Sequence, residues 1–216
     1  MARKTKEDAQ ETRNRILDTA EQVFIERGVS RTSLSAIATA SGLSRGAIYW
    51  HFKNKIDLFD AMMARVTLPI EEMLDQPAAL RDDPLAHIRL AALNVLYRAA
   101  QDAQCRRVFE IVMHKCEFVD EMLEMRQRIS QSRAACLEKV EQGLRQAVRK
   151  GQLPKTVNSR QAAIGLHALI DGLIANWVME PSYFSLANEG ERMVDIYLNG
   201  LRFITPQRVK PLRSKN

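Results

Sequence analysis

The sequence predicts an all-α protein of about nine helices, and two features of the chain support this. The 216 residues include only 9 glycines and 7 prolines, and long stretches contain neither residue, whereas proteins built from many short strands need frequent tight turns. Apolar residues recur at the three- and four-residue spacing of amphipathic helices, and no segment sustains the alternation that is typical of a strand. The chain is long enough for one large domain or two small ones.

Four helices are predicted in the first third of the chain, each with a recognisable boundary. The first covers about residues 7–27 and ends before Gly28. Serine or asparagine then provides an N-cap for each of the next three helices, because its side-chain oxygen can accept a bond from a free backbone N–H. These caps are Ser33 for a short helix that ends at Gly42, Ser44 for residues 45–51, and Asn54 for a helix that continues to about Met73.

The second and third of these helices, joined by Gly42-Leu43-Ser44, form a helix-turn-helix, in which the later helix enters the major groove of DNA. The outer face of that later helix carries long or aromatic side chains that a support helix would not need. Gly46 lowers the helix propensity by about 1 kcal/mol relative to Ala, so we expect its backbone to approach another molecule closely, and a DNA backbone fits. The outer side chains are Arg45, Tyr49, Trp50 and His51, although packing within the domain is an alternative role for Tyr49 and Trp50.

The basic residues are concentrated in two segments. The net charge is +6, but the segment from Arg27 to Lys55 contains five arginines and lysines and no acidic residue, and so does the tail from Arg202 to Asn216. A basic, acid-free segment over a helix-turn-helix is the pattern expected of a surface that meets phosphate, although such a run is more often only a solvated face.

The remaining composition favours a cytoplasmic protein without cofactor, metal or membrane. The three cysteines include no C-x-x-C pair, which disfavours a disulfide framework or a zinc site. His114 and Cys116 point to different faces of a helix, so we interpret His114 and Glu117 as structural or hinge residues. The N-terminus has no apolar signal region. The apolar segment from Ala162 to Met179 approaches membrane-spanning length, but its central Asp171 favours a buried helix.

The rest of the chain predicts a second helical domain. Asp83 caps a helix that begins at Pro84, after a loop that follows Met73. We predict further helices at about 84–102, 105–115, 120–151, 159–179 and 188–203. The predicted division is a DNA-binding domain over residues 1–53, a helical domain for ligand binding and dimerisation over 54–210, and a basic tail over 211–216.

Several helix faces in the second domain could line a ligand site, although each stripe taken alone reads as ordinary core. Asp171 argues for a wet or partnered site, because an unpaired carboxylate on an apolar face is costly, and His167 is one possible partner. Small residues leave room, and Phe and Met provide an adaptable wall. The candidate ligand-binding residues are Val66, Ile88, Ala91, Ala92, Val95, Phe109, Met113, Cys136, Val140, His167, Ile170, Asp171 and Ile174.

Two late helices carry more apolar surface than a monomer needs, which predicts a dimer. Two recognition helices can reach successive major grooves, whereas one buries too little surface for high specificity. The candidate interface residues are Leu166, Leu169, Leu173, Trp177, Met193, Ile196, Tyr197 and Leu201.

Two other classes of protein fit parts of the sequence less well. Gly42 to Gly46 matches G-x-S-x-G, the nucleophile elbow of hydrolases, but that elbow needs a preceding strand in a parallel sheet, and the residues before Ser44 read as helix. A purely structural helical module would not need a DNA-reading surface. We therefore predict that the protein is not an enzyme.

The string TSLSAIATASGLSRGAIYWHFKNK, residues 32–55, closely resembles the signature of TetR-family transcriptional regulators. The residues 1–6, the run Glu11-Thr12-Arg13 and the string HKCEF at 114–118 are similar to the AcrR- and TtgR-like subgroup, whose members repress multidrug efflux pumps. The resemblance implies a homodimeric repressor that binds a palindromic operator and is released by hydrophobic drug-like compounds. Repression of a different catabolic or stress regulon is the alternative.

The resemblance also implies roles for single residues. It places Tyr49, His51 and Lys55 on phosphates, with Thr32 and Ser33 assisting, and a drug cavity between the later helices, where His167 replaces the aromatic residue expected there. Arg45 is the candidate base reader, because its guanidinium can bond guanine O6 and N7 together. From their charge alone, we expect Arg3, Lys4 and Lys6 to form a flexible arm on the DNA backbone or in the minor groove. The full set of candidate DNA-binding residues is Thr32, Ser33, Ser44, Arg45, Gly46, Tyr49, Trp50, His51, Lys53 and Lys55.

Overall fold

The computed structural model describes residues 6–75, 82–117 and 123–205, and within these ranges it contains helices and no strand, as predicted. Of the predicted N-terminal arm, Arg3 and Lys4 lie outside the described residues and Lys6 is the first residue of α1; the basic tail over 211–216 also lies outside the described residues. The helices are α1 (Lys6–Arg27), α2 (Leu34–Ala40), α3 (Arg45–His51), α4 (Lys55–Leu74), α6 (Pro84–Gln101), α7 (Ala103–Glu110), the π-helical turn η1 (Ile111–Lys115), α8 (Leu123–Arg149), α9 (Ser159–Met179), α10 (Leu186–Gly200) and the 3₁₀ turn η3 (Leu201–Phe203).

The predicted helix boundaries in the first third are confirmed by the cap geometry. The side chains of Ser33, Ser44 and Asn54 each accept a hydrogen bond from a backbone N–H in the first turn of α2, α3 and α4. Gly28 and Gly42 adopt φ angles of 81° and 67°, the left-handed conformation that ends a helix without a Cβ penalty.

The helix predicted over residues 105–115 is two pieces. It begins earlier, at Ala103, because the Asp102 side chain accepts bonds from the backbone N–H groups of Gln104 and Cys105. At Ile111 the α-helix changes to the wider π turn of η1, and such turns often occur at functional sites.

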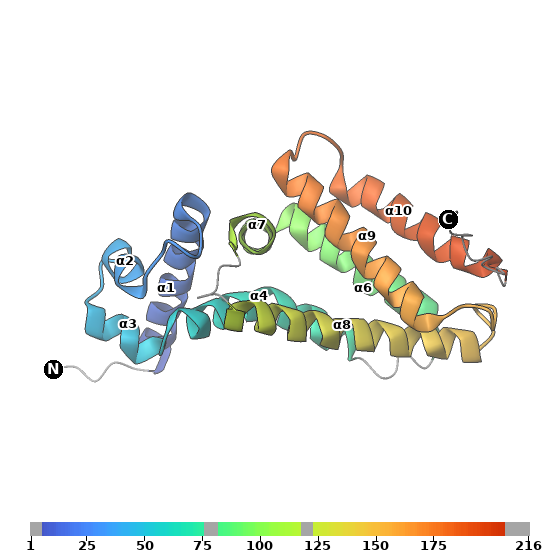
Figure 1. Ribbon diagram of the computed structural model, residues 1–216, viewed down its shortest axis with the longest axis horizontal. Coiled ribbons are helices and arrows are strands. Elements are labelled where there is room, and N and C mark those ends of the chain that lie inside the picture. The colour runs from blue at the N-terminus through green and yellow to red at the C-terminus, as the bar shows by residue number, and fades with distance from the viewer. Residues whose placement is uncertain (1–5, 76–81, 118–122, 206–216) are drawn as a thin grey trace, which may run out of the picture.

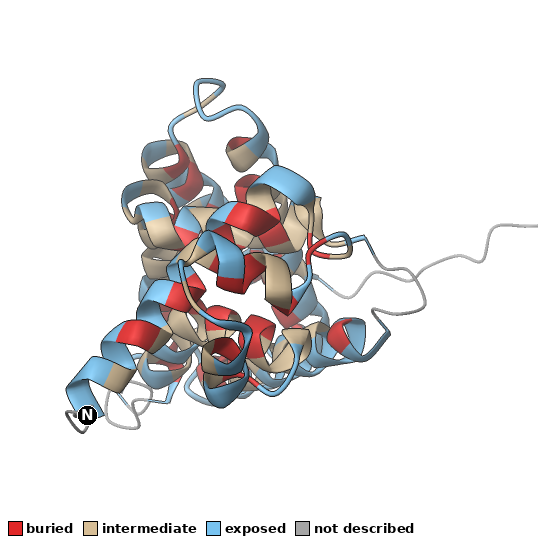
Figure 2. Ribbon diagram, turned by 90° about the vertical axis from the view of Figure 1, so that its left-hand side faces the viewer, coloured by how far each residue is buried: buried red, intermediate tan, exposed pale blue. Residues whose placement is uncertain are grey.

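The helices form an elongated molecule with a small head at one end (Figure 1). Helices α1, α2 and α3 make up the head. The body contains α6, α9 and α10 packed together, with α8 against α9 and α6. Helix α4 leaves the head and runs along α8, while α7 lies between the head and the body. Buried residues lie on the inward faces of these helices, and the outer faces are exposed (Figure 2).

Two apolar clusters hold the described part of the chain together. The head cluster combines α1–α3 with Leu58, Phe59 and Met62 from the first half of α4, and it also takes in residues of α7, η1 and α8. The body cluster contains the inner faces of α6, α8, α9 and α10. Ile70 on α4 and Phe109 on α7 pack against both clusters, so these two helices connect the head to the body.

Helix α9 is the one helix among the described residues that is long and apolar enough to cross a membrane by length and composition. In the structure it packs between α8 and α10, and it buries Leu166, Ile174 and Trp177 in the body cluster. One face of α9 is therefore packed in the body, and 33% of its apolar window is buried.

Candidate nucleic-acid interface

Helix α3 presents one buried face to the head and one exposed face to solvent. Ile48 is fully buried and anchors the helix, and the Ser44 hydroxyl at its start accepts a bond from Ala47 N. The opposite face carries Arg45, with its guanidinium 5.7 Å from the centre of the Tyr49 ring, and Trp50, which is 73% exposed. The Trp50 ring meets the neighbouring His51 ring edge-on, with centroids 4.6 Å apart, and is not buried in the head.

Gly46 lies on the exposed side of α3, where the chain itself leaves room for a larger side chain. A Cβ placed on Gly46 would meet only the Ser44 hydroxyl, at 4.0 Å. The glycine is therefore not required by packing within the described residues. A glycine at this position instead lets another molecule approach the α3 backbone closely, which is a physical reason for its presence.

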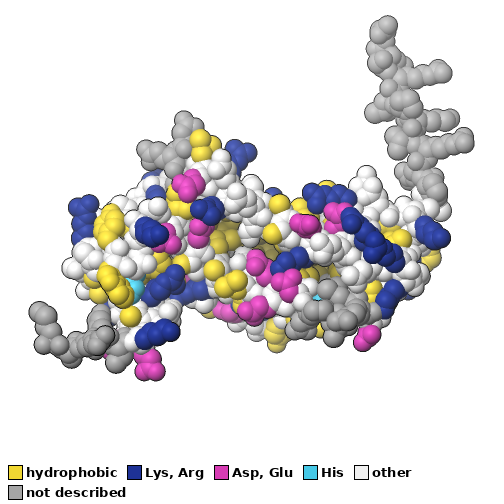
Figure 3. Space-filling view, turned by 90° about the horizontal axis from the view of Figure 1, so that it is seen from below, with side chains coloured by type: hydrophobic (Ala, Val, Ile, Leu, Met, Phe, Trp, Pro, Cys, Tyr) yellow, Lys and Arg dark blue, Asp and Glu magenta, His cyan; other side chains and the backbone are white. Residues whose placement is uncertain are grey.

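A hollow of about 430 Å³ lies beside α3, and five of the predicted DNA-binding residues line it. At this end of the molecule, Lys and Arg side chains lie next to exposed hydrophobic ones (Figure 3). The lining comes from the loop between α1 and α2, the start of α2, the end of α3 and the start of α4. The predicted residues here are Thr32, Ser33, Tyr49, Lys53 and Lys55, and Ser30, Arg31, Leu34 and Asn54 complete the lining.

Two of these residues have internal partners that the sequence did not reveal. Thr32 is buried, and its hydroxyl donates to the Gly28 carbonyl at 2.8 Å, which holds the loop between α1 and α2 in place. The Lys55 ammonium donates to the carbonyls of Val29 and Ser30 at 2.8 and 3.1 Å. Lys55 therefore braces the loop between α1 and α2, in addition to any contact with a phosphate.

Ser44 is a helix cap and not a hydrolase nucleophile. It follows α2, a helix, whereas the nucleophile elbow requires a strand at that position.

The three cysteines are free thiols, and burial raises the pKa of Cys105 and Cys116 to about 12. Thiols with such values stay protonated near neutral pH.

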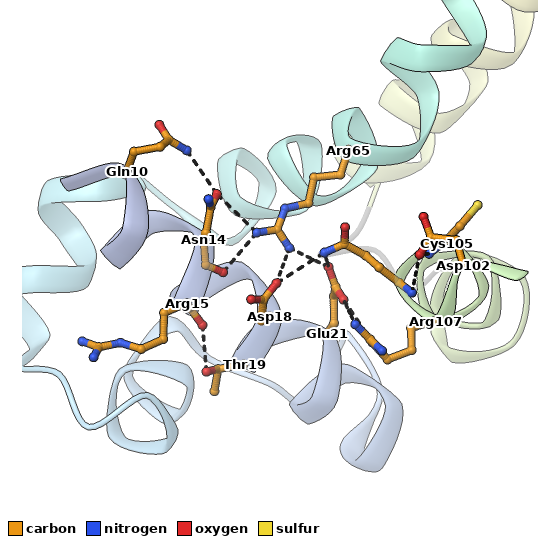
Figure 4. A network of polar contacts seen from close by, with 11 residues as sticks. Gln10, Asn14, Arg15, Asp18, Thr19, Glu21, Arg65, Asp102, Cys105 and Arg107 are labelled. Atoms are coloured by element: carbon orange, nitrogen blue, oxygen red, sulfur yellow. Dashed lines mark hydrogen bonds and ion pairs between the residues drawn. The ribbon is translucent and has the colours of Figure 1, made fainter. Parts of the chain in front are cut away.

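A buried carboxylate connects α1 of the head to α4 and α7. Glu21 on α1 has a side chain with no exposed surface, and it accepts bonds from Arg65 on α4 and Arg107 on α7 (Figure 4). Arg65 also bonds the Asp18 carboxylate and the Asn14 carbonyl of α1. Burial raises the pKa of Glu21, and the two arginines oppose that shift. Sequence reasoning missed Glu21, although its place between Leu17 and Phe24 on the apolar stripe is a signal for burial.

A second set of contacts joins the loop after α1 to the end of η1. Val29 N donates to the Lys115 carbonyl at 3.0 Å. The Glu117 carboxylate accepts bonds from the Ser30 hydroxyl and the Arg31 guanidinium. His114 contacts the Ala175 carbonyl of α9 at 3.0 Å, so the segment His114–Glu117 lies between the head and α9.

Most predicted ligand-binding residues gather in the body cluster, on α6, α8 and α9. Val66 does not: it is buried in the head cluster on α4, where its carbonyl accepts a bond from Arg98 of α6. The remaining apolar candidates are packed core residues or lie against that core. The body-cluster members are Ile88, Ala91, Ala92, Val140 and Ile174, with Val95, Phe109, Met113, Cys136 and Ile170 packed against them.

Asp171 has partners from two helices. His167 Nδ1, one turn earlier on α9, lies 3.2 Å from the Asp171 carboxylate, as the sequence suggested. Arg133 on α8 donates to the same oxygen at 2.9 Å, a contact that sequence reasoning did not find. This polar group lies next to Cys136, a predicted ligand-binding residue, whose pKa is raised chiefly by burial and also by the charge of Asp171.

The face of α9 that was predicted to form the dimer is not the face that the structure leaves exposed to solvent. Leu166, Leu173 and Trp177 are buried within the chain, and Leu169 packs against the same core, because this face meets α8 and α10. Leu201 is also buried, and Tyr197 packs over Gly165 with its hydroxyl donating to the Ala162 carbonyl. The assignment of these six residues to surplus apolar surface is wrong. The apolar side chains that remain exposed on α9, α10 and η3 are Ile164, Met179, Met193, Ile196 and Phe203.

Comparisons with known proteins cover both parts of the chain. The family described as bacterial regulatory proteins, tetR family, matches residues 16–62, and that described as MAATS-type transcriptional repressor, C-terminal region, matches residues 83–203. The regulator TtgR of Pseudomonas putida is 41% identical over 204 residues, which cover 94% of this chain and 97% of TtgR. The regulator AcrR of Shigella flexneri is 43% identical over 202 residues, which cover 92% of this chain and 93% of AcrR.

Two solved structures have the same fold. NalD, the secondary repressor of the MexAB-OprM multidrug efflux pump in Pseudomonas aeruginosa, superposes with a TM-score of 0.82 at 36% identity, covering 92% of this chain and 99% of NalD. SmeT, the repressor of the Stenotrophomonas maltophilia multidrug efflux pump SmeDEF, was solved in complex with triclosan. That complex gives a TM-score of 0.79 at 31% identity, covering 94% of this chain and all of SmeT.

Proposed function

The chain belongs to the TetR family of bacterial regulatory proteins, and on that premise we propose that it is a ligand-responsive repressor of a multidrug efflux operon. The observation that carries this proposal is the exposed face of α3 beside a hollow lined by basic and hydroxyl side chains. Phosphate contacts from this hollow would fix the register of the head on DNA, and Arg45 would read base edges in the groove. The head then acts as the DNA-binding domain, divided from the helical domain at about residue 53.

We propose that the functional unit is a homodimer formed through α9 and α10. Ile164 and Met179 on α9, together with Ile196 on α10 and Phe203 on η3, supply exposed apolar surface that a lone chain leaves in water. A dimer places two α3 helices on successive major grooves of a palindromic operator. A cytoplasmic location follows from this DNA target.

The proposed inducer is a hydrophobic, drug-like compound that enters the body between α6, α8 and α9. TtgR, AcrR and NalD, to which the chain is similar, are regulators, and NalD and SmeT are named as repressors of multidrug efflux pumps. The group formed by Asp171, His167 and Arg133 would provide polar contacts beside the apolar core residues. These similarities favour efflux control over a catabolic or stress regulon.

The proposed release mechanism is a shift of α4 and α7. Both helices touch the head and the body. A ligand that displaces them therefore also moves α3 relative to the head of the other subunit in the dimer. Ligand changes the population of the two states only through its differential affinity. A hundredfold preference for the shifted state contributes about 2.7 kcal/mol per site.

Fluorescence anisotropy tests this function directly. The purified protein is titrated onto the intergenic DNA next to its own gene and onto a scrambled duplex, across salt, and then with a panel of hydrophobic antibiotics. Selective, salt-sensitive binding that one of these compounds reverses is the expected result. Selective binding that no compound disturbs would contradict efflux control, and equal binding to both duplexes would contradict the assignment to this DNA.

A further inference from the structure

The Glu117 carboxylate is bound by two donors from the loop between α1 and α2. The Ser30 hydroxyl donates to one oxygen at 3.0 Å, and the Arg31 guanidinium donates to the other at 3.1 Å. One hydroxyl and one guanidinium that converge on an anion are the donors that commonly hold a phosphate of a nucleic-acid backbone.

The same two donors belong to the proposed DNA interface. Ser30 and Arg31 line the hollow together with Tyr49, Lys53 and Lys55. The Lys55 ammonium also holds the Ser30 carbonyl at 3.1 Å, which fixes the position of this loop relative to α4. The carboxylate of Glu117 is therefore an anion placed at the edge of a basic surface that the proposed function assigns to DNA.

Glu117 follows η1 and lies outside the three helices α1, α2 and α3 of the head. Two residues before it, the Lys115 carbonyl accepts a bond from Val29 N, and His114 at the end of η1 contacts α9. The carboxylate is thus tied on one side to the head loop and, through His114, on the other side to α9 of the proposed ligand site. Its bonds to Arg31 and Ser30 lower the pKa of Glu117, so it stays ionised at neutral pH.

We propose that Ser30 and Arg31 form an additional phosphate-binding position on the DNA interface, which Glu117 occupies in the DNA-free protein as an internal substitute for the phosphate. This inference rests on the proposed DNA-binding function. On DNA, the backbone phosphate replaces the carboxylate, and Glu117 is released. The exchange is favourable because the Arg31 and Glu117 side chains are both largely exposed, 74% and 55%, and an exposed ion pair is weak. A phosphate contact also gains from counterion release.

The exchange has a regulatory consequence. In a conformation that keeps Glu117 bonded to Arg31, the carboxylate competes with DNA phosphate. In a conformation that moves η1 away from the loop, Ser30 and Arg31 are free to bind phosphate. The affinity of the head for DNA then depends on the position of the Glu117 carboxylate, independently of the distance between the two heads of a dimer.

The test uses the full chain and anisotropy titrations on the upstream duplex and the scrambled duplex over a range of salt. We expect Arg31→Ala to weaken binding to both duplexes several-fold and to lower the slope of log K against log salt by about 1. We expect Glu117→Gln to tighten binding to both duplexes by about two- to fivefold, the range that loss of a competing exposed ion pair allows. In the Arg31→Ala background, Glu117→Gln should have no further effect.

Two control variants separate this exchange from a general change of charge. Glu26→Gln removes an exposed acid from α1 in the same head, and Arg149→Ala removes an exposed arginine from the far end of α8. Neither should reproduce the paired effects. Since all four side chains are on the surface, thermal melting should show intact folding for each variant.

Two results would overturn the inference. Arg31→Ala with unchanged affinity and salt slope would show that Arg31 holds no phosphate. Glu117→Gln that weakens binding as much as Arg31→Ala would show that Glu117 positions the loop and does not compete with DNA. Either result leaves selective binding by the unmodified protein intact, whereas loss of that selectivity would contradict the proposed function itself.

Discussion

The carboxylate of Glu21 on α1 lies 2.9 Å from the guanidinium of Arg65 on α4, and no part of the Glu21 side chain reaches solvent. Arg107 on α7 contacts the other oxygen of this carboxylate at 3.1 Å. Three helices, α1, α4 and α7, which all contribute to the head cluster, therefore meet at one buried charge. Removing a partner from such a group leaves a charge uncompensated in a poorly solvated place, which is costly.

Arg107→Gln tests the importance of this charge. The pKa of Glu21 is raised in the folded state, so its contribution to stability is greatest at low pH and is lost as the pH rises through the raised value. Loss of Arg107 raises that pKa further. We expect the variant to be less stable by about 1–3 kcal/mol at pH 7.5, with a smaller deficit at pH 5.

Urea denaturation at the two pH values measures this effect, and Arg126→Gln, which changes an exposed arginine on α8, is the control. The control should lose less than about 0.5 kcal/mol at both pH values. A deficit for Arg107→Gln that is the same at pH 5 and pH 7.5 would refute the role of the Glu21 charge.

Gly46→Ala should separate stability from DNA binding. The Cβ meets no atom closer than 4.0 Å in the described chain, and Ala favours a helix by up to about 1 kcal/mol over Gly. We expect a higher melting temperature together with weaker operator binding, because the added methyl group occupies the space between α3 and DNA. Unchanged operator affinity would show that the α3 backbone does not approach DNA at this point.

Arg45→Ala and Lys53→Ala should have different effects on DNA recognition. Both side chains are exposed, but Arg45 lies at the start of α3 and Lys53 lies in the hollow. Loss of Arg45 should reduce the ratio of operator to scrambled affinity, by about tenfold if one bidentate base contact is lost. Loss of Lys53 should weaken binding to both duplexes alike and lower the salt slope by about 1. Equal effects of Arg45→Ala on the two duplexes would exclude Arg45 as a base reader.

Ile196→Glu should dissociate the proposed dimer. Ile196 on α10 is 72% exposed in one chain, so a charge there does not disturb the fold of that chain, but it is costly in an apolar interface. Light scattering after size-exclusion chromatography should show a monomer with unchanged helical circular dichroism. Leu90→Glu, at an exposed position on α6, is the matched control and should stay dimeric. A dimer that persists in Ile196→Glu would place the interface elsewhere.

The sequence predicted the local structure of the head well, because local chemistry controls it. Ser33, Ser44 and Asn54 cap helices through bonds to backbone three residues away, so the pattern of side chains is enough to identify them. The fold class and the elements of the body were also predicted, since the apolar spacing of each helix is visible in its own segment.

The sequence was a poorer guide wherever two distant segments meet. The α9 stripe of Leu166, Leu173 and Trp177 was correctly identified as apolar, but periodicity does not tell whether such a stripe meets the same chain or a second one. The partners of Glu21, Lys55 and Asp171 also come from other helices or loops, and nothing in their own segments names those partners.

The contacts of Glu21 with α7 and of Val29 with η1 mean that the head is held by more than the chain connection through α4. Two heads fixed in this way to a dimeric body would tolerate little variation in the spacing of operator half-sites. Inserting one base pair between the half-sites moves the second one by about 3.4 Å and rotates it by about 34° around the duplex. An operator altered in this way keeps every contacted base, yet the rigid dimer could engage only one half-site at a time.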